Sequence, residues 1–362
     1  MNWSAERARF PVLEHFVYLN SGTFGPLARA TVDAISQLRS WEAEHGRGGR
    51  PYFDEMLARR ERIRTLFAGH IHVPAANVAL TESTTRGVQV VVAGLELGPD
   101  DHVVTTDAEH FGLTGPLLAS GARLQIAKVR GARAADIFGL INAEITPQTR
   151  LIATSAVSWL DGAIFPWREL QESSGLPVLV DGAQSVGALD VDATAADFYT
   201  VSAQKWLCGP DATGALYVRE PEALRPRLVG YPSVETYDIA AGTWEPKAGA
   251  ARFDTGFAPA SSLAGLEAAL TGLPAGRFER ARELTEHCRT LLADAGHEVV
   301  TESGQGTLVS FVAPGDAAAA SAALYEHGVI IRDLPSSGLL RASVGWWNED
   351  SDLERLVEAL EN

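Results

Sequence analysis

The sequence predicts an α/β fold, in which a mixed, mostly parallel seven-stranded sheet with flanking helices is followed by a smaller α+β domain. Between about residues 77 and 219, short β-branched runs alternate with longer amphipathic or Ala-rich stretches. This alternation is typical of a parallel sheet with helices on both faces. The chain has 362 residues, of which 46% are hydrophobic and 21% charged. That composition is ordinary for a soluble globular protein, and that length favours two domains.

The seven strands are expected at residues 78–81, 102–106, 123–129, 151–157, 177–181, 198–202 and 214–219. Helix-like segments lie between them, for example at 87–95 and 166–173.

After residue 219, a looser stretch rich in Gly and Pro, 229–259, leads to a helical segment at 261–295. The remaining elements are strands at 298–301, 307–312, 329–332 and 339–344, an Ala-rich helix near 316–323 and a final helix at 350–360. We therefore predict a large domain over residues 16–250. A small domain follows over 251–362 and includes part of residues 1–15.

The charge and the cysteine content exclude several classes of function. The formal net charge is −16, which would repel nucleic acid and anionic membranes. The N-terminus lacks the apolar core of a signal peptide, and no apolar run is long enough to span a bilayer. Cys208 and Cys288 are too few for a disulfide framework and are not spaced as a zinc site. We expect a cytoplasmic protein with no nucleic-acid, membrane or metal partner.

Polar clusters follow four of the predicted strands, at the sheet edge where open α/β sheets bind their ligands. The first cluster contains Ser83, Thr84 and Thr85 ahead of an apolar helix. Hydroxyls and free N–H groups at a helix start can bind phosphate, although such clusters also serve simply as helix caps. The second cluster ends in His110, which could stack on a planar ring or be an ordinary loop residue.

The third and fourth clusters supply a carboxylate and an amine. Asp181 ends a buried apolar strand, where a carboxylate needs a cation or hydrogen bonds, unless it only caps the next helix. Lys205 follows the strand at 198–202 and is one of only three lysines, with Lys128 and Lys247. Partial desolvation there would lower its pKa and favour imine formation. The four clusters could bind a phosphate, stack on a flat ring, pair with a ring nitrogen and form an imine with an aldehyde. Pyridoxal phosphate has all four of these groups.

Seven segments distributed along nearly the whole chain carry a family resemblance: "YLNSGTFGPL", "TESTTRGV", "DAEH", "VDGAQSVGALDVD", "SAQKWLCGPDATGALYV", "RFDTG" and "LLRASVGWWNEDSDLERLVEAL". With these segments in this order, the sequence resembles the class V aminotransferase superfamily of fold-type I pyridoxal phosphate enzymes. That group includes cysteine desulfurases, selenocysteine lyases, isopenicillin N epimerases and carbon-sulfur lyases such as ergothioneine β-lyase.

The resemblance implies roles for individual residues. Lys205 would bind the cofactor aldehyde, Asp181 would keep the pyridinium nitrogen protonated, and His110 would stack on the ring. Gln184 would contact the ring hydroxyl. Further expected contacts are Ser83, Thr84, Thr85, Ser202 and Gln204 with the phosphate, and Arg341, Asn20 and Trp159 with the substrate. Arg341 would hold the substrate carboxylate, although a structural salt bridge is an alternative role for it.

The sequence also departs from the cysteine desulfurase pattern. Gln204 stands where desulfurases have His, and Trp159 stands where they have Asn, which suggests a bulkier or more aromatic substrate pocket. Phe257 replaces a phosphate-binding Thr of the neighbouring subunit, with Thr255 as a possible substitute. The segment "RDLPSSGLLR" at 332–341 has no cysteine, whereas desulfurases carry their persulfide cysteine there.

We therefore expect a lyase that eliminates sulfur from Cβ of an S-substituted cysteine, a cysteine sulfoxide or cystine, giving pyruvate, ammonia and a sulfur product. The freed Lys205 would act as the general base. An aminotransferase, an amino-acid epimerase and a non-catalytic cofactor-binding protein remain alternatives; the missing cysteine argues against a desulfurase. By the same resemblance we expect a homodimer with its active site at the subunit interface. Residues 46–53 and 229–257 are its candidate interface and substrate loops.

Overall fold

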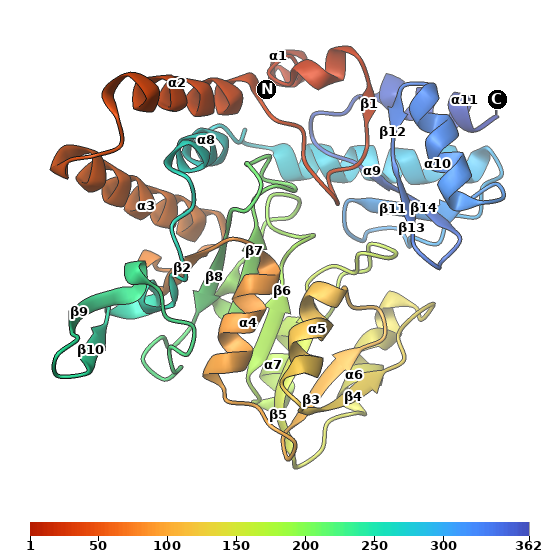
Figure 1. The fold of residues 1–362 in the computed structure, drawn as a ribbon. Helices are drawn as coiled ribbons and strands as arrows, with labels where there is room; N and C mark the ends of the chain where they lie inside the picture. Colours follow the sequence, from red (N-terminus) through yellow and green to blue (C-terminus); the bar gives the residue numbers. More distant parts are fainter. Residues whose placement is uncertain (362) are drawn as a thin grey trace.

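The predicted sheet is present in the computed structural model, which describes residues 1–361. Its strands lie in the order β2-β8-β7-β6-β5-β3-β4 (Figure 1). Only β8 is antiparallel to its neighbours, so the prediction of a mixed, mostly parallel seven-stranded sheet is confirmed. The strands are β2 (Val78–Thr81), β3 (His102–Thr106), β4 (Arg123–Ala127), β5 (Thr149–Ser155), β6 (Val178–Asp181), β7 (Phe198–Ser202) and β8 (Gly214–Val218).

The central strands are apolar because both faces of the sheet are covered. Alternate residues point to opposite faces. Leu151 and Leu179 belong to the core on one side, together with helices α4 (Thr84–Gly94) and α5 (Phe111–Ala119). Ile152 and Val180 belong to the core on the other side. The helices of that second side are α3 (Arg50–His70), α6 (Ile137–Asn142) and α7 (Trp167–Ser174).

The C-terminal part forms a separate α+β layer above the sheet in Figure 1. Its three-stranded antiparallel sheet has the order β11-β14-β13. A separate two-stranded parallel sheet pairs β1 with β12. The segment predicted as a strand at 298–301 forms only one isolated bridge, between Val299 and Phe311. The elements are β1 (Val17–Tyr18), β11 (Leu308–Val312), β12 (Val329–Ile330), β13 (Arg332–Leu334), β14 (Leu339–Ser343), α9 (Arg277–Asp294), α10 (Ala317–Glu326) and α11 (Asp350–Glu361).

The N-terminal segment packs against this C-terminal part. Helix α1 (Trp3–Arg7) ends in Arg7, which forms two hydrogen bonds with Asp352, at 2.7 and 2.9 Å. Phe10 packs against the adjacent rings of Trp346 and Trp347. The division into a large domain at 16–250 and a small domain at 251–362 stays a prediction.

Two long helices were not predicted. Helix α2 (Arg29–His45) buries only Thr31. Its apolar stripe is narrow, with Ile35 and Leu38 half-buried, so the pattern that marks a helix in a sequence is weak. Helix α3 places Arg60 and Arg64 on its buried face, where both bind Asp254 at 2.8 and 2.9 Å. Because α3 begins at Arg50, the loop expected at 46–53 is confined to residues 46–49.

The looser stretch at 229–259 contains an exposed hairpin of β9 (Val234–Asp238) and β10 (Thr243–Pro246) at the edge of the molecule (Figure 1). Helix α8 (Ala260–Thr271) follows it and packs on α2 and α3. Single-turn 3-10 helices lie at Pro11–Glu14, Ala75–Asn77, Ala134–Asp136, Ala193–Ala195, Tyr231–Ser233 and Gly249–Phe253. Among residues 1–361, no helix has the length and apolarity needed to cross a membrane. The same residues contain no group of three or more His, Cys, Asp or Glu side chains placed to hold a metal ion.

Candidate active site

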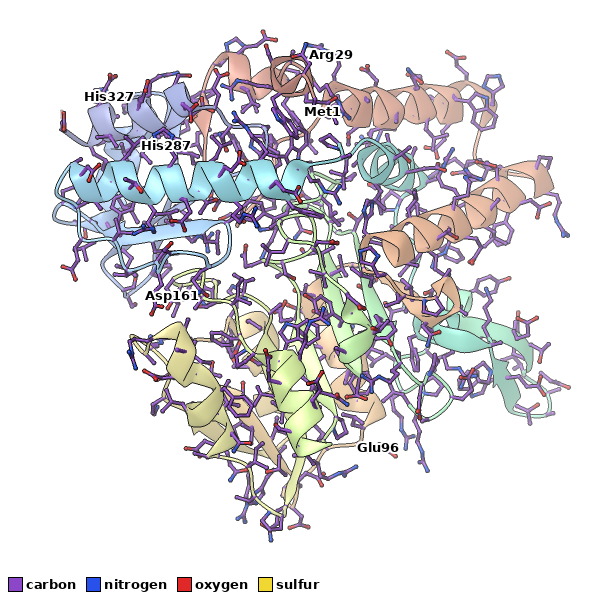
Figure 2. The ribbon with its side chains drawn as sticks, turned by 180° about the vertical axis from the view of Figure 1, so that it is seen from behind. Met1, Arg29, Glu96, Asp161, His287 and His327 are labelled. Atoms are coloured by element: carbon purple, nitrogen blue, oxygen red, sulfur yellow. The ribbon has the colours of Figure 1, made fainter. Side chains whose placement is uncertain are left out.

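A pocket of about 260 Å³ opens at the carboxyl ends of β5, β6 and β7, beside the N-terminus of α4. Strands β13 and β14 of the C-terminal part close its other side. Figure 2 shows Asp161, in the loop after β5, at the boundary between these two parts. The pocket brings together most of the predicted site residues: Ser83, Thr84, Thr85, His110, Trp159, Asp181, Gln184, Ser202, Gln204, Lys205 and Arg341.

The polar end of the pocket lies at the start of α4. Ser83 is the N-cap of this helix, because its Oγ accepts a hydrogen bond from the Arg86 N–H at 3.1 Å. The first N–H groups of a helix have no intrahelical partner, and the helix dipole favours an anion there. Ser202 donates to Gln204 Oε1 at 2.7 Å, which leaves the amide nitrogen of Gln204 available to donate. This end of the pocket can therefore bind a phosphate.

Lys205 follows β7 in a tight turn. The turn is closed by backbone hydrogen bonds from Cys208 to Lys205 and from Gly25 to Gln204. A Cβ atom on Gly25 would lie 2.0 Å from the Lys205 carbonyl oxygen, so only glycine fits there. Burial lowers the pKa of the Lys205 amine to about 8, against the opposing effect of the Asp181 carboxylate. The site thus holds an amine that is readily deprotonated.

Asp181 is a buried carboxylate in the same pocket as the Lys205 amine, but the two do not form a salt bridge. Asp181 is 4% exposed, and its Oδ1 accepts a hydrogen bond from the Ala183 N–H at 2.9 Å. No salt bridge in the described part of the chain includes it. Since a buried charge is costly unless it is paired, this carboxylate is suited to form an ion pair with a protonated ring nitrogen of a ligand.

His110 stands at the mouth of the pocket as the N-cap of α5. Its Nδ1 accepts a hydrogen bond from the Gly112 N–H at 3.0 Å, so its proton lies on Nε2. Burial lowers the pKa of His110, and the positive charge of Lys205 adds to this effect. The Trp159 ring lies edge-on to the imidazole, with centroids 5.4 Å apart. His110 therefore presents a neutral ring to the pocket.

Arg341 is 2% exposed and has no acidic partner within residues 1–361. It donates to the Trp159 carbonyl at 2.8 Å, while its buried Nε has no partner. Arg341 therefore forms no structural salt bridge with residues 1–361, so the alternative role expected for it is wrong for these residues. Arg332 is paired with Arg341 in the β13–β14 register and also lines the pocket. Burial lowers the pKa of Arg341 to about 9, and the charge of Arg332 adds to the decrease.

The model of the aminotransferase class-V family matches residues 17–356 of the chain. The chain belongs to the class-V aminotransferase family. This family depends on pyridoxal phosphate, and the fold is that of fold-type I.

Individual relatives of this class-V chain have several activities. Isopenicillin N epimerase of Streptomyces clavuligerus is 28% identical, over 99% of this chain and 98% of its own. Cysteine desulfurase CsdA of Escherichia coli strain K12 is also 28% identical, over 98% of this chain and 96% of its own. Cystine C-S lyase C-DES, solved with its product cysteine persulfide, has a TM-score of 0.90 at 25% identity, covering 98% of this chain and 99% of its own.

The residues present fit the cofactor of the class-V family. An unpaired buried carboxylate, Asp181, and an amine of lowered pKa, Lys205, are the two groups that the ring nitrogen and the aldehyde require. The helix N-terminus at Ser83 can hold the phosphate. Gln184 also lines the pocket, and its amide donates to the Gly22 carbonyl at 2.8 Å.

Two predicted residues of this class-V chain lie outside the pocket lining. Asn20 forms a backbone bridge with Ser343, beside Arg341, and its buried Oδ1 has no hydrogen-bond partner. Thr255 donates to the carboxylate of Glu82, at 3.2 Å from each oxygen. Their contacts with substrate and phosphate stay predictions.

Sequence reasoning missed Glu109, directly before His110. Its buried carboxylate accepts hydrogen bonds from Thr106 at 2.9 Å, Thr154 at 3.1 Å, and Ser155 at 3.0 and 2.5 Å. Burial raises its pKa to about 7, although the hydrogen bonds from Ser155 oppose the increase. An acidic residue shortly after a buried strand was the signal for Glu109 in the sequence. For Arg332, the signal was a second arginine in the segment 332–341 that also contains Arg341.

Proposed function

We propose that this protein is a pyridoxal-phosphate-dependent carbon-sulfur lyase that acts on a cysteine-derived amino acid. The substrate would be an S-substituted cysteine, a cysteine sulfoxide or cystine. The products would be pyruvate, ammonia and a sulfur compound. One observation carries the proposal: the amine of Lys205 shares a pocket with two guanidinium groups that have no acidic partner among residues 1–361, and none of these residues that line the pocket is a cysteine.

We assign each residue a role that its position in the pocket supports. Arg341 binds the substrate α-carboxylate, which a guanidinium can hold through two parallel hydrogen bonds. Lys205 removes the Cα proton, because its lowered pKa leaves much of the amine uncharged near pH 8. Asp181 keeps the ring nitrogen protonated. The bound cofactor supplies the electron sink that allows the Cα–H and Cβ–S bonds to break.

Arg332 supports a substrate with a further hydrogen-bond acceptor. Arg332 has no acidic partner in residues 1–361, and it lines the same pocket as Arg341. The buried Nε1 of Trp159 is also without a partner. A sulfoxide oxygen or the second carboxylate of cystine would satisfy these donors.

Other reactions of the family use the same lysine and aspartate. An aminotransferase would pass the amine to a keto acid, and an epimerase would return the proton to the other face of Cα. A cysteine desulfurase needs an accessible cysteine. Cys208 and Cys288 are 3% and 1% exposed, and burial raises the pKa of both thiols. These features favour elimination over persulfide transfer to the enzyme.

We also propose that the protein is a homodimer, in which the partner subunit completes the phosphate end of the pocket. Large aromatic side chains are exposed along residues 229–257, including Tyr231 at 67%, Tyr237 at 60% and Phe257 at 38%. Exposed apolar patches of this kind mark interfaces, and an isolated two-stranded hairpin has little stability of its own. Light scattering should give twice the mass of one chain. A cytoplasmic location stays a prediction.

The decisive experiment is an absorption spectrum of the purified protein before and after borohydride, followed by assays for pyruvate. L-cysteine, cystine and an S-alkylcysteine sulfoxide serve as substrates. We expect a yellow protein, a reduced adduct on Lys205, and pyruvate from at least one sulfur amino acid. Lys205→Ala should abolish pyruvate formation, whereas the control Lys128→Ala should not, because Lys128 is 79% exposed.

The other outcomes separate the alternatives. If no pyruvate forms and the amino group is transferred to a keto acid, the protein is an aminotransferase and not a lyase. Exchange of the Cα proton with loss of optical activity would indicate an epimerase. A protein that does not bind pyridoxal phosphate would refute the catalytic proposal.

A further inference from the structure

We propose that Trp206 is a positioning residue that fixes the amide of Gln184, so that Gln184 meets the bound cofactor as a hydrogen-bond donor. The indole Nε1–H of Trp206 donates to Gln184 Oε1 at 3.0 Å. Gln184 Nε2 donates to the Gly22 carbonyl at 2.8 Å. This inference concerns cofactor binding and does not depend on which substrate the enzyme uses.

The two contacts permit only one orientation of the amide. An indole nitrogen can only donate, and a backbone carbonyl can only accept. Turning the amide by 180° would place two donors together at Trp206 and two acceptors together at Gly22. Trp206 is 1% exposed and does not line the pocket, so water could not repair the contact between the two donors there.

The fixed orientation decides what Gln184 offers to the pocket. An amide nitrogen has two N–H groups, and the Gly22 carbonyl uses one of them. The second N–H is left for a ligand, and Gln184 lines the pocket beside Asp181 and Lys205. A donor in this place favours the deprotonated form of the cofactor's ring hydroxyl, because hydrogen bonds to a charged form stabilise it.

The surroundings of Trp206 hold its indole in place. Its backbone follows Lys205 directly, and a Cβ atom on Gly187 would lie 2.7 Å from the Trp206 carbonyl carbon. Its ring packs against Trp347, with centroids 6.5 Å apart. Trp206 therefore connects the C-terminal part of the chain to the cofactor pocket.

Trp347 provides a matched control. It is also 1% exposed and lies in the same aromatic cluster, but its Nε1 has no hydrogen-bond partner. Trp347→Phe removes a comparable buried volume without removing a hydrogen bond. Trp206→Phe removes the volume and the donor together.

The test measures the affinity of the cofactor-free protein for pyridoxal phosphate and the pH midpoint of the bound cofactor's absorption change. We expect Trp206→Phe to weaken binding about tenfold relative to Trp347→Phe, the effect of one hydrogen bond to a charged group. The pH midpoint should rise in Trp206→Phe and stay unchanged in Trp347→Phe. In a Gln184→Met background, Trp206→Phe should have no further effect on either quantity.

Trp206→His keeps a ring N–H and serves as the rescue. Its affinity should lie within about threefold of the Trp347→His control. Equal affinities and midpoints in the two Phe variants would overturn the proposal. An equal tenfold loss in both Trp206 variants would also overturn it, because packing would then explain the effect. If Trp206→Phe does not fold, the comparison of Trp206→His with Trp347→His decides the question. Affinities for pyridoxal phosphate within threefold of each other support the donor role of Trp206, and a tenfold loss in Trp206→His refutes it.

Discussion

The buried carboxyl of Glu109 should make the stability of this protein depend on pH. Its four hydrogen bonds come from hydroxyl and backbone donors, and no cation compensates its charge within residues 1–361. Glu109→Gln removes the charge and keeps an acceptor oxygen. We therefore expect the variant to lose the component of the pH dependence that belongs to this residue.

The magnitude follows from the pKa of Glu109, which burial raises from 4.5 to about 7. Between these two values the folded state binds a proton that the unfolded state has released. The contribution of Glu109 is therefore most favourable at low pH, and it decreases as the pH rises through about 7. The total decrease is about 3 kcal/mol, at about 1.4 kcal/mol for each pH unit between the two pKa values, and most of it falls between pH 5 and pH 8.

Urea unfolding of the cofactor-free proteins at pH 5, 6, 7 and 8 tests this reasoning. The free energy of unfolding of the wild type should fall relative to that of Glu109→Gln by about 2 to 3 kcal/mol over this range. The control is Glu172→Gln, on the exposed face of α7, which should run parallel to the wild type. Parallel curves for wild type and Glu109→Gln would refute a raised pKa at this carboxyl.

Three further predictions concern the scaffold and the pocket. Asp254→Asn should lower the free energy of unfolding by about 3 to 5 kcal/mol in urea, because it removes the buried counter-charge that Arg60 and Arg64 of α3 share and leaves Arg64 with the exposed Glu61 alone; a loss below 1 kcal/mol would contradict this. Acetylation of Lys205 in the cofactor-free protein, followed by peptide mass mapping, should rise with a midpoint near pH 8 and not near its ordinary 10.5, since burial lowers its pKa. Gly22→Ala should raise KM about tenfold, because its Cβ would lie 2.6 Å from a guanidinium nitrogen of Arg341; an unchanged KM would separate Gly22 from the substrate site.

The sheet could be predicted because its strands are buried on both faces. Continuous apolar runs such as those of β6 and β7 contrast with the polar residues that end them, so both the strand and the site edge are visible in the sequence. Helices α2 and α3 could not be predicted in this way. Helix α2 buries only Thr31. Helix α3 buries two arginines whose shared buried counter-charge, Asp254, lies 190 or more residues away in the sequence.

The sequence by itself predicted the cofactor, which the family confirms, and it predicted the principal groups that would bind it. Asp181 ends a parallel strand, Lys205 and His110 each come shortly after one, and the carboxyl ends of parallel strands meet at one edge of the sheet. Tertiary structure alone decided that Arg332 stands beside Arg341, because strand register places them together. It also decided that Trp206 and Gly22 hold Gln184 from two sides. A hydrogen bond between residues 162 positions apart depends on how the chain folds back on itself, and no local pattern of residue types encodes that distance.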